Sequence, residues 1–434
     1  MFALSYAFWG AILVVDQLLL PMFHLAGFPY KVSYFLVAIW GLNHLMVRRQ
    51  GIAEQERSRD FRQLSFAFAG IIGCAVLGEL LLALNHSVPS YTDAINGVLF
   101  YILAALAFGL GLSSKRFSLK ILIWVFYAAV GLNLAFIFLR SSMPSWLSNF
   151  YFSQLDVQYL NLSYVGSVQD ILDLARPRGY FSNPDGSALA VNIIVLFIYL
   201  GFRKKLLSLP SPVNAAGIIF FPIVTSLLLA SRGEFIVSVV LAALNFRVIF
   251  GGFSKSKRTG FLGLLVLLIG IGVFSAQSQD ESIASSFDRI SSIMKILNQD
   301  QGGDTYEARN HGVARPLLKV ELAYDRFSYS PIFGSGFSAT ESGSFAEGTH
   351  YFHNDWFRLA VTSGIIGVIL MIWVIKKFCL SISIVAIIPW LLPGLVNSFM
   401  LNIAVFMFYF YMIGLFREKL RSQPLIVGAS LVKE

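Results

Sequence analysis

Two histidines stand where the chain leaves a long polar segment and enters an apolar one. His350 and His353 precede the apolar segment 357–375, and Asn354 directly follows His353. Because a helix N-terminus carries partial positive charge, it disfavours imidazolium, and a neutral histidine there can act as a general base. Two other interpretations are open: interfacial histidines beside a Trp356 aromatic belt, or a metal site without a clear third ligand.

Arginines form a second candidate feature. Arg176 and Arg178 lie in the stretch 176–185, just before an apolar segment, and Arg232 lies in a very short connection between two others. A guanidinium offers planar, bidentate donors to phosphate. An ionisable group as close to hydrocarbon as Arg232 indicates function by default. The structural alternatives are a juxtamembrane turn at 176–185, and for Arg232 a pair with Glu234 or contact with lipid phosphate.

The composition determines which elements must position these side chains. Of 434 residues, 56% are hydrophobic and 13% are charged, and the mean hydropathy is +0.69. Soluble domains carry about 25% charged residues. A soluble enzyme, a disordered chain and a nucleic-acid-binding domain are therefore excluded. The two cysteines, Cys74 and Cys379, lie in apolar runs and predict no disulfide framework.

Apolar segments long enough for membrane spans recur along the chain. A helix that crosses the hydrocarbon needs about 20 apolar residues. The sequence predicts an all-α polytopic membrane protein with about twelve transmembrane helices. The predicted segments are 3–22, 30–47, 63–84, 94–112, 119–139, 187–202, 213–230, 234–250, 260–276, 357–375, 379–397 and 399–416.

Basic residues predict the orientation of these spans. Lys and Arg follow every even-numbered segment, so these exits and both termini are expected in the cytoplasm. The two long connections then face the other side. The chain is predicted to divide into helices one to five (1–139), an extracytoplasmic loop (140–186), helices six to nine (187–276), a large extracytoplasmic loop (277–356), and helices ten to twelve with a cytoplasmic tail (357–434).

Some polar and small residues fall inside the predicted spans. For Asp16 and Glu79 we expect hydrogen-bonded structural roles facing the bundle interior, with a proton path as the alternative. Small residues let helices approach closely. This role is predicted for two glycine pairs, Gly70 with Gly73 and Gly364 with Gly367.

Four short motifs occur in a fixed order between about residues 170 and 375. They are Arg-x-x-Gly-x-Phe-x-Asn-Pro ending at Pro184, Ser-Arg-Gly at 231–233, Pro-x-x-Gly-x-Gly at 331–336, and His353-Asn354 followed by Gly-x-x-Gly at 364–367. Because it carries these four motifs in combination, the chain resembles the O-antigen ligase/O-antigen polymerase family of bacterial envelope glycosyltransferases. Asp185 departs from the family's usual Asn, and Arg178 leaves open which arginine of the pair is the matching one.

The resemblance implies a metal-independent, inverting glycosyl transfer without a cofactor, at the periplasmic face of the bacterial inner membrane. The implied donor is a glycan linked to undecaprenyl diphosphate, and the acceptor is another glycan or the lipid A–core. Other expected partners are membrane lipids and, as a further candidate, a chain-length regulator, but not nucleic acid. The implied site residues are His353 as catalytic base, Arg176, Arg178 and Arg232 at the diphosphate, and Asn354, Gly336 and His350 in support.

Three alternatives compete with a polymerase. The motifs do not separate it from an O-antigen ligase, and we favour the polymerase because nothing in the large loop is an obvious core-oligosaccharide site. A polysaccharide-related transporter or flippase would be expected to show internal repeats and ionisable groups at the bilayer midplane. Here no repeat is visible, and the notable charges are predicted at the outer rim. A non-catalytic membrane scaffold would explain the spans but not the predicted position of Arg232 beside the bilayer.

Overall fold

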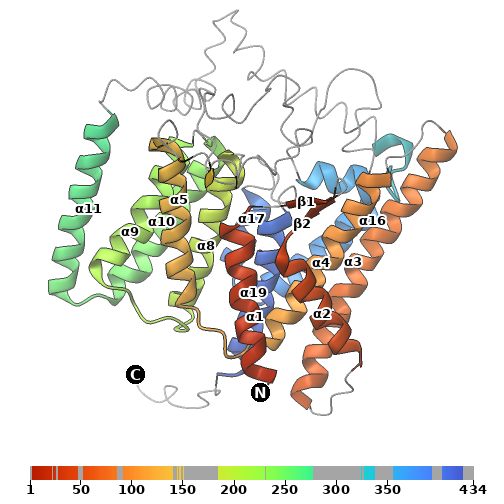
Figure 1. Cartoon of the computed structure of the whole chain (residues 1–434), viewed down its shortest axis with the longest axis horizontal. Helices are drawn as coiled ribbons and strands as arrows, with labels where there is room; N and C mark the ends of the chain where they lie inside the picture. The colour runs from red at the N-terminus through yellow and green to blue at the C-terminus, as the bar shows by residue number, and fades with distance from the viewer. Residues whose placement is uncertain are drawn as a thin grey trace, which may run out of the picture.

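The computed structural model is a bundle of helices with one short β-hairpin in the part of the chain that it describes (Figure 1). It describes residues 2–21, 23–25, 28–46, 52–85, 91–139, 144, 146–147, 150, 184–229, 231–276, 324, 327–337, 355–392 and 403–423. The hairpin pairs β1 (Phe23–Leu25) with the antiparallel β2 (Phe28–Tyr30).

The described helices follow one another with short connections inside each group. The first group is α1 (Phe2–Leu19), α2 (Val32–Met46), α3 (Ile52–Asn85), α4 (Tyr91–Ser113) and α5 (Ile121–Phe138). The second is α8 (Pro184–Arg203), α9 (Pro212–Leu228), α10 (Arg232–Gly252) and α11 (Lys255–Ala276). The third is α16 (Asp355–Val374), the π-helix η3 (Ile375–Cys379), the 3-10 helix η4 (Ile384–Ile387), α17 (Ile388–Leu391) and α19 (Ile403–Arg421).

Several helices are long and apolar enough to cross a membrane, as a polytopic membrane protein requires. Within the described residues six such regions occur: Gln55–Leu84, Ala94–Ser113, Ile121–Phe138, Gly186–Arg203, Gly233–Gly252 and Asp355–Cys379. Three shorter apolar helices cover Tyr6–Leu19, Val32–Asn43 and Pro212–Leu228. These confirm the polytopic character of the chain, whereas the count of twelve spans stays a prediction.

The prediction of one helix over 379–397 is wrong for the part of it that the structure describes. The chain turns after Cys379 and then forms only η4 and α17. Pro389 lies in the first turn of α17. Because proline lacks an amide hydrogen and its ring clashes with the carbonyl four residues earlier, a helix cannot run through this position undisturbed.

α19 is the central helix of the bundle (Figure 1). It packs against α4, α1 and α8, and every side chain from Ala404 to Phe416 is buried. Aromatic rings fill its contacts with α3 and α4. Phe406 stacks on Phe100 with ring centroids 4.2 Å apart, and Phe410 meets Phe68 at 5.2 Å.

The contact between α4 and α19 depends on glycine. A Cβ at Gly414 would overlap the main-chain oxygen of Phe108 and lie 3.1 Å from the amide nitrogen of Leu112. A Cβ at Gly111 would overlap the oxygen of Tyr411 in return. The two backbones therefore approach as closely as small residues allow.

The predicted glycine pairs have mixed outcomes. Gly70 faces α16, where a Cβ would lie 2.7 Å from Leu370 Cδ1, so close helix approach is confirmed there. Around Gly73 a Cβ would meet nothing within 4 Å among the described residues, so that prediction is wrong. Gly367 is crowded by Ser363 of its own helix rather than by a neighbouring one.

Asp16 has the hydrogen-bonded structural role that the sequence predicts. The main-chain amide of Ser33, in the first turn of α2, donates to Asp16 Oδ2 at 2.8 Å. In return Lys31 Nζ donates to the main-chain oxygens of Asp16 and Leu20 at the end of α1, both at 2.6 Å. Since an anion suits a helix N-terminus and a cation a C-terminus, each helix stabilises the end of the other.

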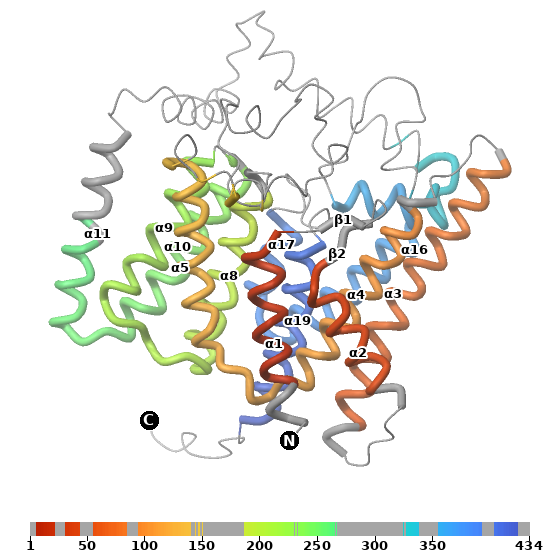
Figure 2. The backbone as a smooth tube through the Cα atoms, in the orientation of Figure 1, coloured from red at the N-terminus to blue at the C-terminus, as the bar shows by residue number. Residues whose placement is uncertain are grey.

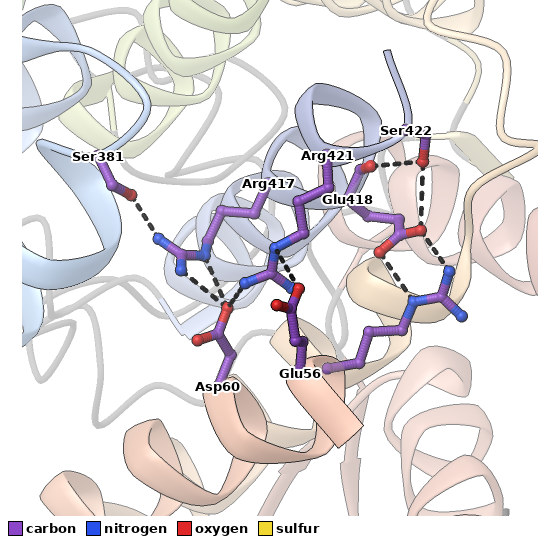
Figure 3. Close-up of polar contacts among 8 residues, drawn as sticks. Glu56, Asp60, Ser381, Arg417, Glu418, Arg421 and Ser422 are labelled. Atoms are coloured by element: carbon purple, nitrogen blue, oxygen red, sulfur yellow. Dashed lines mark hydrogen bonds and ion pairs between the residues drawn. The ribbon is translucent and has the colours of Figure 1, made fainter. Parts of the chain in front are cut away.

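Charged residues that follow the second and twelfth predicted spans contact one another (Figure 3). The first turns of α3, which follows a long tilted course in Figure 2, carry Arg57 and Asp60. Arg57 makes a bidentate contact with Glu418 of α19, with Nε 2.8 Å from Oε2. The shared location of these two basic regions is confirmed, whereas the side of the membrane stays a prediction.

Asp60 is the centre of this cluster. Arg417 donates to Asp60 Oδ2 from Nε at 3.0 Å and from Nη2 at 2.8 Å, and Arg421 contacts the same oxygen. The Asp60 side chain is only 2% exposed. Glu56, one turn earlier, is 52% exposed and lies 4.0 Å from Arg421.

Candidate functional site

The Pro-x-x-Gly-x-Gly motif forms a loop that docks onto α16. The amide of Ser335 donates to the main-chain oxygen of Val361 at 2.6 Å, and the amide of Gly336 donates to Thr362 at 3.1 Å. In the other direction, Ile365 donates to the oxygen of Pro331 at 2.9 Å. Loop and helix therefore exchange main-chain hydrogen bonds in both directions.

This exchange occurs at a break in α16. Gly364 has φ 64° and ψ −167°, which interrupts the helix, and Gly334 and Gly336 have φ 79° and 88°. Only glycine adopts such backbone angles without strain. The loop supplies hydrogen-bond partners for main-chain groups that an interrupted helix leaves unpaired. Two separate sequence motifs are thus one structural unit.

α3 and α4 form the other wall around the loop. Glu79, which is buried, lies against Gly336, where a Cβ would overlap Glu79 Oε2 and lie 2.8 Å from Glu79 Cα. Gly97 of α4 faces the ring of Phe337, whose centroid is 6.4 Å from that of Tyr101. The predicted interior position of Glu79 is confirmed, and its carboxylate lies beside the loop.

Two charged residues, Asp355 and Arg358, lie in the first turn of α16, and the sequence reasoning missed Arg358. Asp355 is 1% exposed and Arg358 is partly buried, and both lie within electrostatic range of the Tyr101 hydroxyl. Trp356 Nε1 donates to the main-chain oxygen of Trp390 at 3.0 Å and so anchors this turn to α17. The available signal was an arginine inside a predicted apolar span, which is costly unless it has a role.

The Ser-Arg-Gly motif forms the start of α10. Ser231 is fully buried and precedes the helix with extended backbone angles, and α10 begins at Arg232. The amide of Ser231 donates to the oxygen of Ser226 at 3.1 Å, and the amide of Phe235 donates to Ser231 at 2.9 Å. The main chain that carries Arg232 is therefore held against the end of α9.

Most predicted site residues lie outside the described part of the chain. This applies to Arg176, Arg178, His350, His353 and Asn354, and to the side chain of Arg232. Their predicted convergence is therefore neither supported nor contradicted. The described residues do show that α16 begins at Asp355, directly after the His-Asn pair, as the sequence predicts.

Among described residues, no group of three His, Cys, Asp or Glu side chains is arranged to hold a metal ion.

The fold and these motifs define a multi-pass membrane protein with a glycine-stabilised loop on a broken helix. Residues 217–372 match the model of a family described as O-antigen ligase. The match runs from α9 to α16 and includes Arg232, Gly336 and His353, but not Arg176 or Arg178. It confirms the resemblance to the O-antigen ligase/polymerase family and indicates a membrane enzyme of that type. No curated protein and no solved structure matches the chain significantly.

Proposed function

We propose that this protein transfers a glycan from undecaprenyl diphosphate to a sugar hydroxyl, as an O-antigen or exopolysaccharide polymerase. The strongest support is the loop 331–337, which joins two of the four motifs through main-chain hydrogen bonds within the family match. This loop stabilises the helix that begins directly after His353 and Asn354. A rigid element next to a candidate base suits an enzyme, because catalytic groups need fixed positions.

In the proposed reaction His353 accepts the proton of the acceptor hydroxyl while that oxygen attacks the anomeric carbon of the donor. The bond from this carbon to the diphosphate oxygen breaks, and undecaprenyl diphosphate leaves with the electron pair, so the configuration is inverted. General base catalysis typically contributes 10²–10⁴-fold. We assign stabilisation of the leaving diphosphate to Arg176, Arg178 and Arg232, and such electrostatic stabilisation is often the largest catalytic contribution.

An O-antigen ligase is the second candidate, favoured by the description of the matched family. A gene deletion followed by electrophoresis of envelope glycans separates the two functions. If the protein is a polymerase, the deletion strain retains glycans with a single repeat unit. If it is a ligase, full-length polymer accumulates on the lipid carrier. A glycan profile identical to that of the wild type would contradict both functions.

The assignment of His353 is tested by transfer assays with purified variants and a defined lipid-linked donor. His353→Ala should lose roughly 10²–10⁴-fold in turnover and still bind the donor, whereas His350→Ala should be milder. If neutral His353 is the active form, transfer should fall at acidic pH, where the imidazole is protonated. Near-normal turnover of His353→Ala would reject the base assignment.

The diphosphate site is tested at Arg232. Arg232→Lys should be impaired as well as Arg232→Ala, since an ammonium group cannot make the bidentate contact of a guanidinium. The measurement is the KM for the lipid-linked donor. Wild-type kinetics in both variants would refute the donor-site role.

A further inference from the structure

Four buried polar side chains connect α8, α9 and α10 next to the Arg232 motif. Asn192 Nδ2 donates to Glu234 Oε2 at 2.8 Å and to the main-chain oxygen of Glu234 at 2.9 Å. Ser238 Oγ lies 2.8 Å from Asn192 Oδ1 and 2.7 Å from Ser226 Oγ. Each of the four residues is at most 1% exposed. This polar network lies entirely inside the helix bundle.

The network fixes the first turn of α10 against two neighbouring helices. Glu234 lies in that turn, two residues after Arg232 begins the helix. Asn192 ties the turn to α8 through both the side chain and the main chain of Glu234. Ser238 Oγ lies 3.1 Å from the main-chain oxygen of Pro222 in α9. The position of Arg232's main chain is therefore determined by contacts with α8 and α9.

A glutamate in this place requires an explanation. Burying an ionisable group within an apolar bundle is costly, and such residues are retained where they have a specific task. The helix N-terminus stabilises a negative charge in the first turn. Asn192 also holds this turn against α8, because it donates to both the side chain and the main chain of Glu234. Glu234 thus combines a favourable local field with rigid hydrogen bonding.

We propose that Glu234 is a positioning residue that, together with Asn192, sets the place of Arg232 at the diphosphate of the lipid-linked donor. This inference rests on the proposed role of Arg232 in donor binding. Glu234 acts through the main chain of α10 and does not itself contact the substrate. Its loss should therefore weaken donor binding while leaving acceptor binding unchanged.

Three substitutions test this arrangement in transfer assays with the purified full-length protein and its lipid-linked glycan donor. Glu234→Ala and Asn192→Ala each remove one side of the same link, and should lower kcat/KM for the donor by about 10²-fold, a loss that a 1 Å misplacement can cause. Glu234→Gln keeps an oxygen that can accept from Asn192 Nδ2, so it should recover most of this loss. The KM for the acceptor should stay at the wild-type value.

Asn245→Ala provides a matched control for a merely structural effect. Asn245 is also fully buried in α10, but its Nδ2 donates to the main-chain oxygen of Leu241 in the same helix. Loss of this residue should lower thermal stability without changing the donor KM of the folded protein. An equal rise in donor KM for Asn245→Ala and Asn192→Ala would overturn the inference.

A double-mutant cycle with Arg232→Lys tests whether Glu234 acts through Arg232. If it does, adding Glu234→Ala to Arg232→Lys should cost far less than the 10²-fold expected in the wild-type background. Fully additive losses would overturn the positioning role while leaving the donor site intact. Wild-type kinetics of both Arg232→Lys and Arg232→Ala would overturn the donor-site proposal and this inference with it.

Discussion

Substitution of Gly336 by alanine should detach the loop 331–337 from α16. Gly336 has φ 88°, and a Cβ there would lie 2.8 Å from Glu79 Cα, a main-chain atom that cannot swing aside. A left-handed backbone costs a non-glycine residue about 1–2 kcal/mol, and overpacking costs about 1–3 kcal/mol. The docked loop should therefore lose about 2–5 kcal/mol. At about 3 kcal/mol, the ratio of docked to undocked loop falls roughly a hundredfold.

Hydrogen exchange measures this loss directly. The amides of Ser335 and Gly336 donate to α16 in the docked loop, so a peptide that covers them should exchange faster in Gly336→Ala. Glycan transfer activity of Gly336→Ala should fall together with the population of docked loop.

The matched control is Gly73→Ala in α3, where a Cβ meets nothing within 4 Å among the described residues. Alanine is favoured over glycine in a helix interior by roughly 0.5–1 kcal/mol, so this variant should keep full stability and activity. Wild-type exchange and activity in Gly336→Ala would refute the reasoning.

Three further predictions concern the bundle and its orientation. Asp60→Asn should destabilise the protein by about 3 kcal/mol, because it leaves two arginines without their buried carboxylate. Glu56→Gln removes one partner of an exposed ion pair and should cost about 0.5 kcal/mol or less. Thermal unfolding in detergent compares the two variants, and equal melting temperatures would contradict the burial argument. Gly414→Ala should cost about 1–3 kcal/mol by overpacking α19 against α4, unlike Gly131→Ala, whose Cβ would meet no atom of the described residues within 4 Å. Reporter fusions at Asp300 and at the C-terminus should report opposite compartments, and the same compartment for both would overturn the predicted topology.

The sequence predicts the helices well because their length and apolar character are local properties. The start of α16 was predicted for the same reason, whereas the structural role of Asp16 was predicted because an ionisable group inside an apolar span needs partners. Part of the failure at 379–397 has a local cause, because a helix cannot run undisturbed through Pro389. The turn directly after Cys379 precedes this proline and is not explained by it. α3 begins earlier than the apolar segment 63–84, because its first turns are held by ion pairs with α19 that are remote in sequence.

The candidate site was predicted in parts but not in its assembly. The glycines of two motifs could be named from the sequence, yet their pairing through main-chain hydrogen bonds leaves no pattern in side-chain types. The hydrogen bond between Asn192 and Glu234 could not be predicted either, because it joins two helices and the two residues are 42 positions apart in the sequence. At Gly73 the sequence predicted a close helix contact that the described structure does not have, because small size alone does not determine which face of a helix meets a neighbour.

The place of α19 in the chain has a consequence for biogenesis. It is the last helix that the structure describes, yet it provides the central packing surface for α1, α4 and α8. Ribosomes deliver those helices to the membrane before α19 exists, so their surfaces that pack against α19 stay without this partner until then. Maturation of the bundle is therefore completed after synthesis of Ile403–Arg421. A premature stop codon just before Ile403 would leave a nearly full-length product without its centre, as a substrate for membrane quality control.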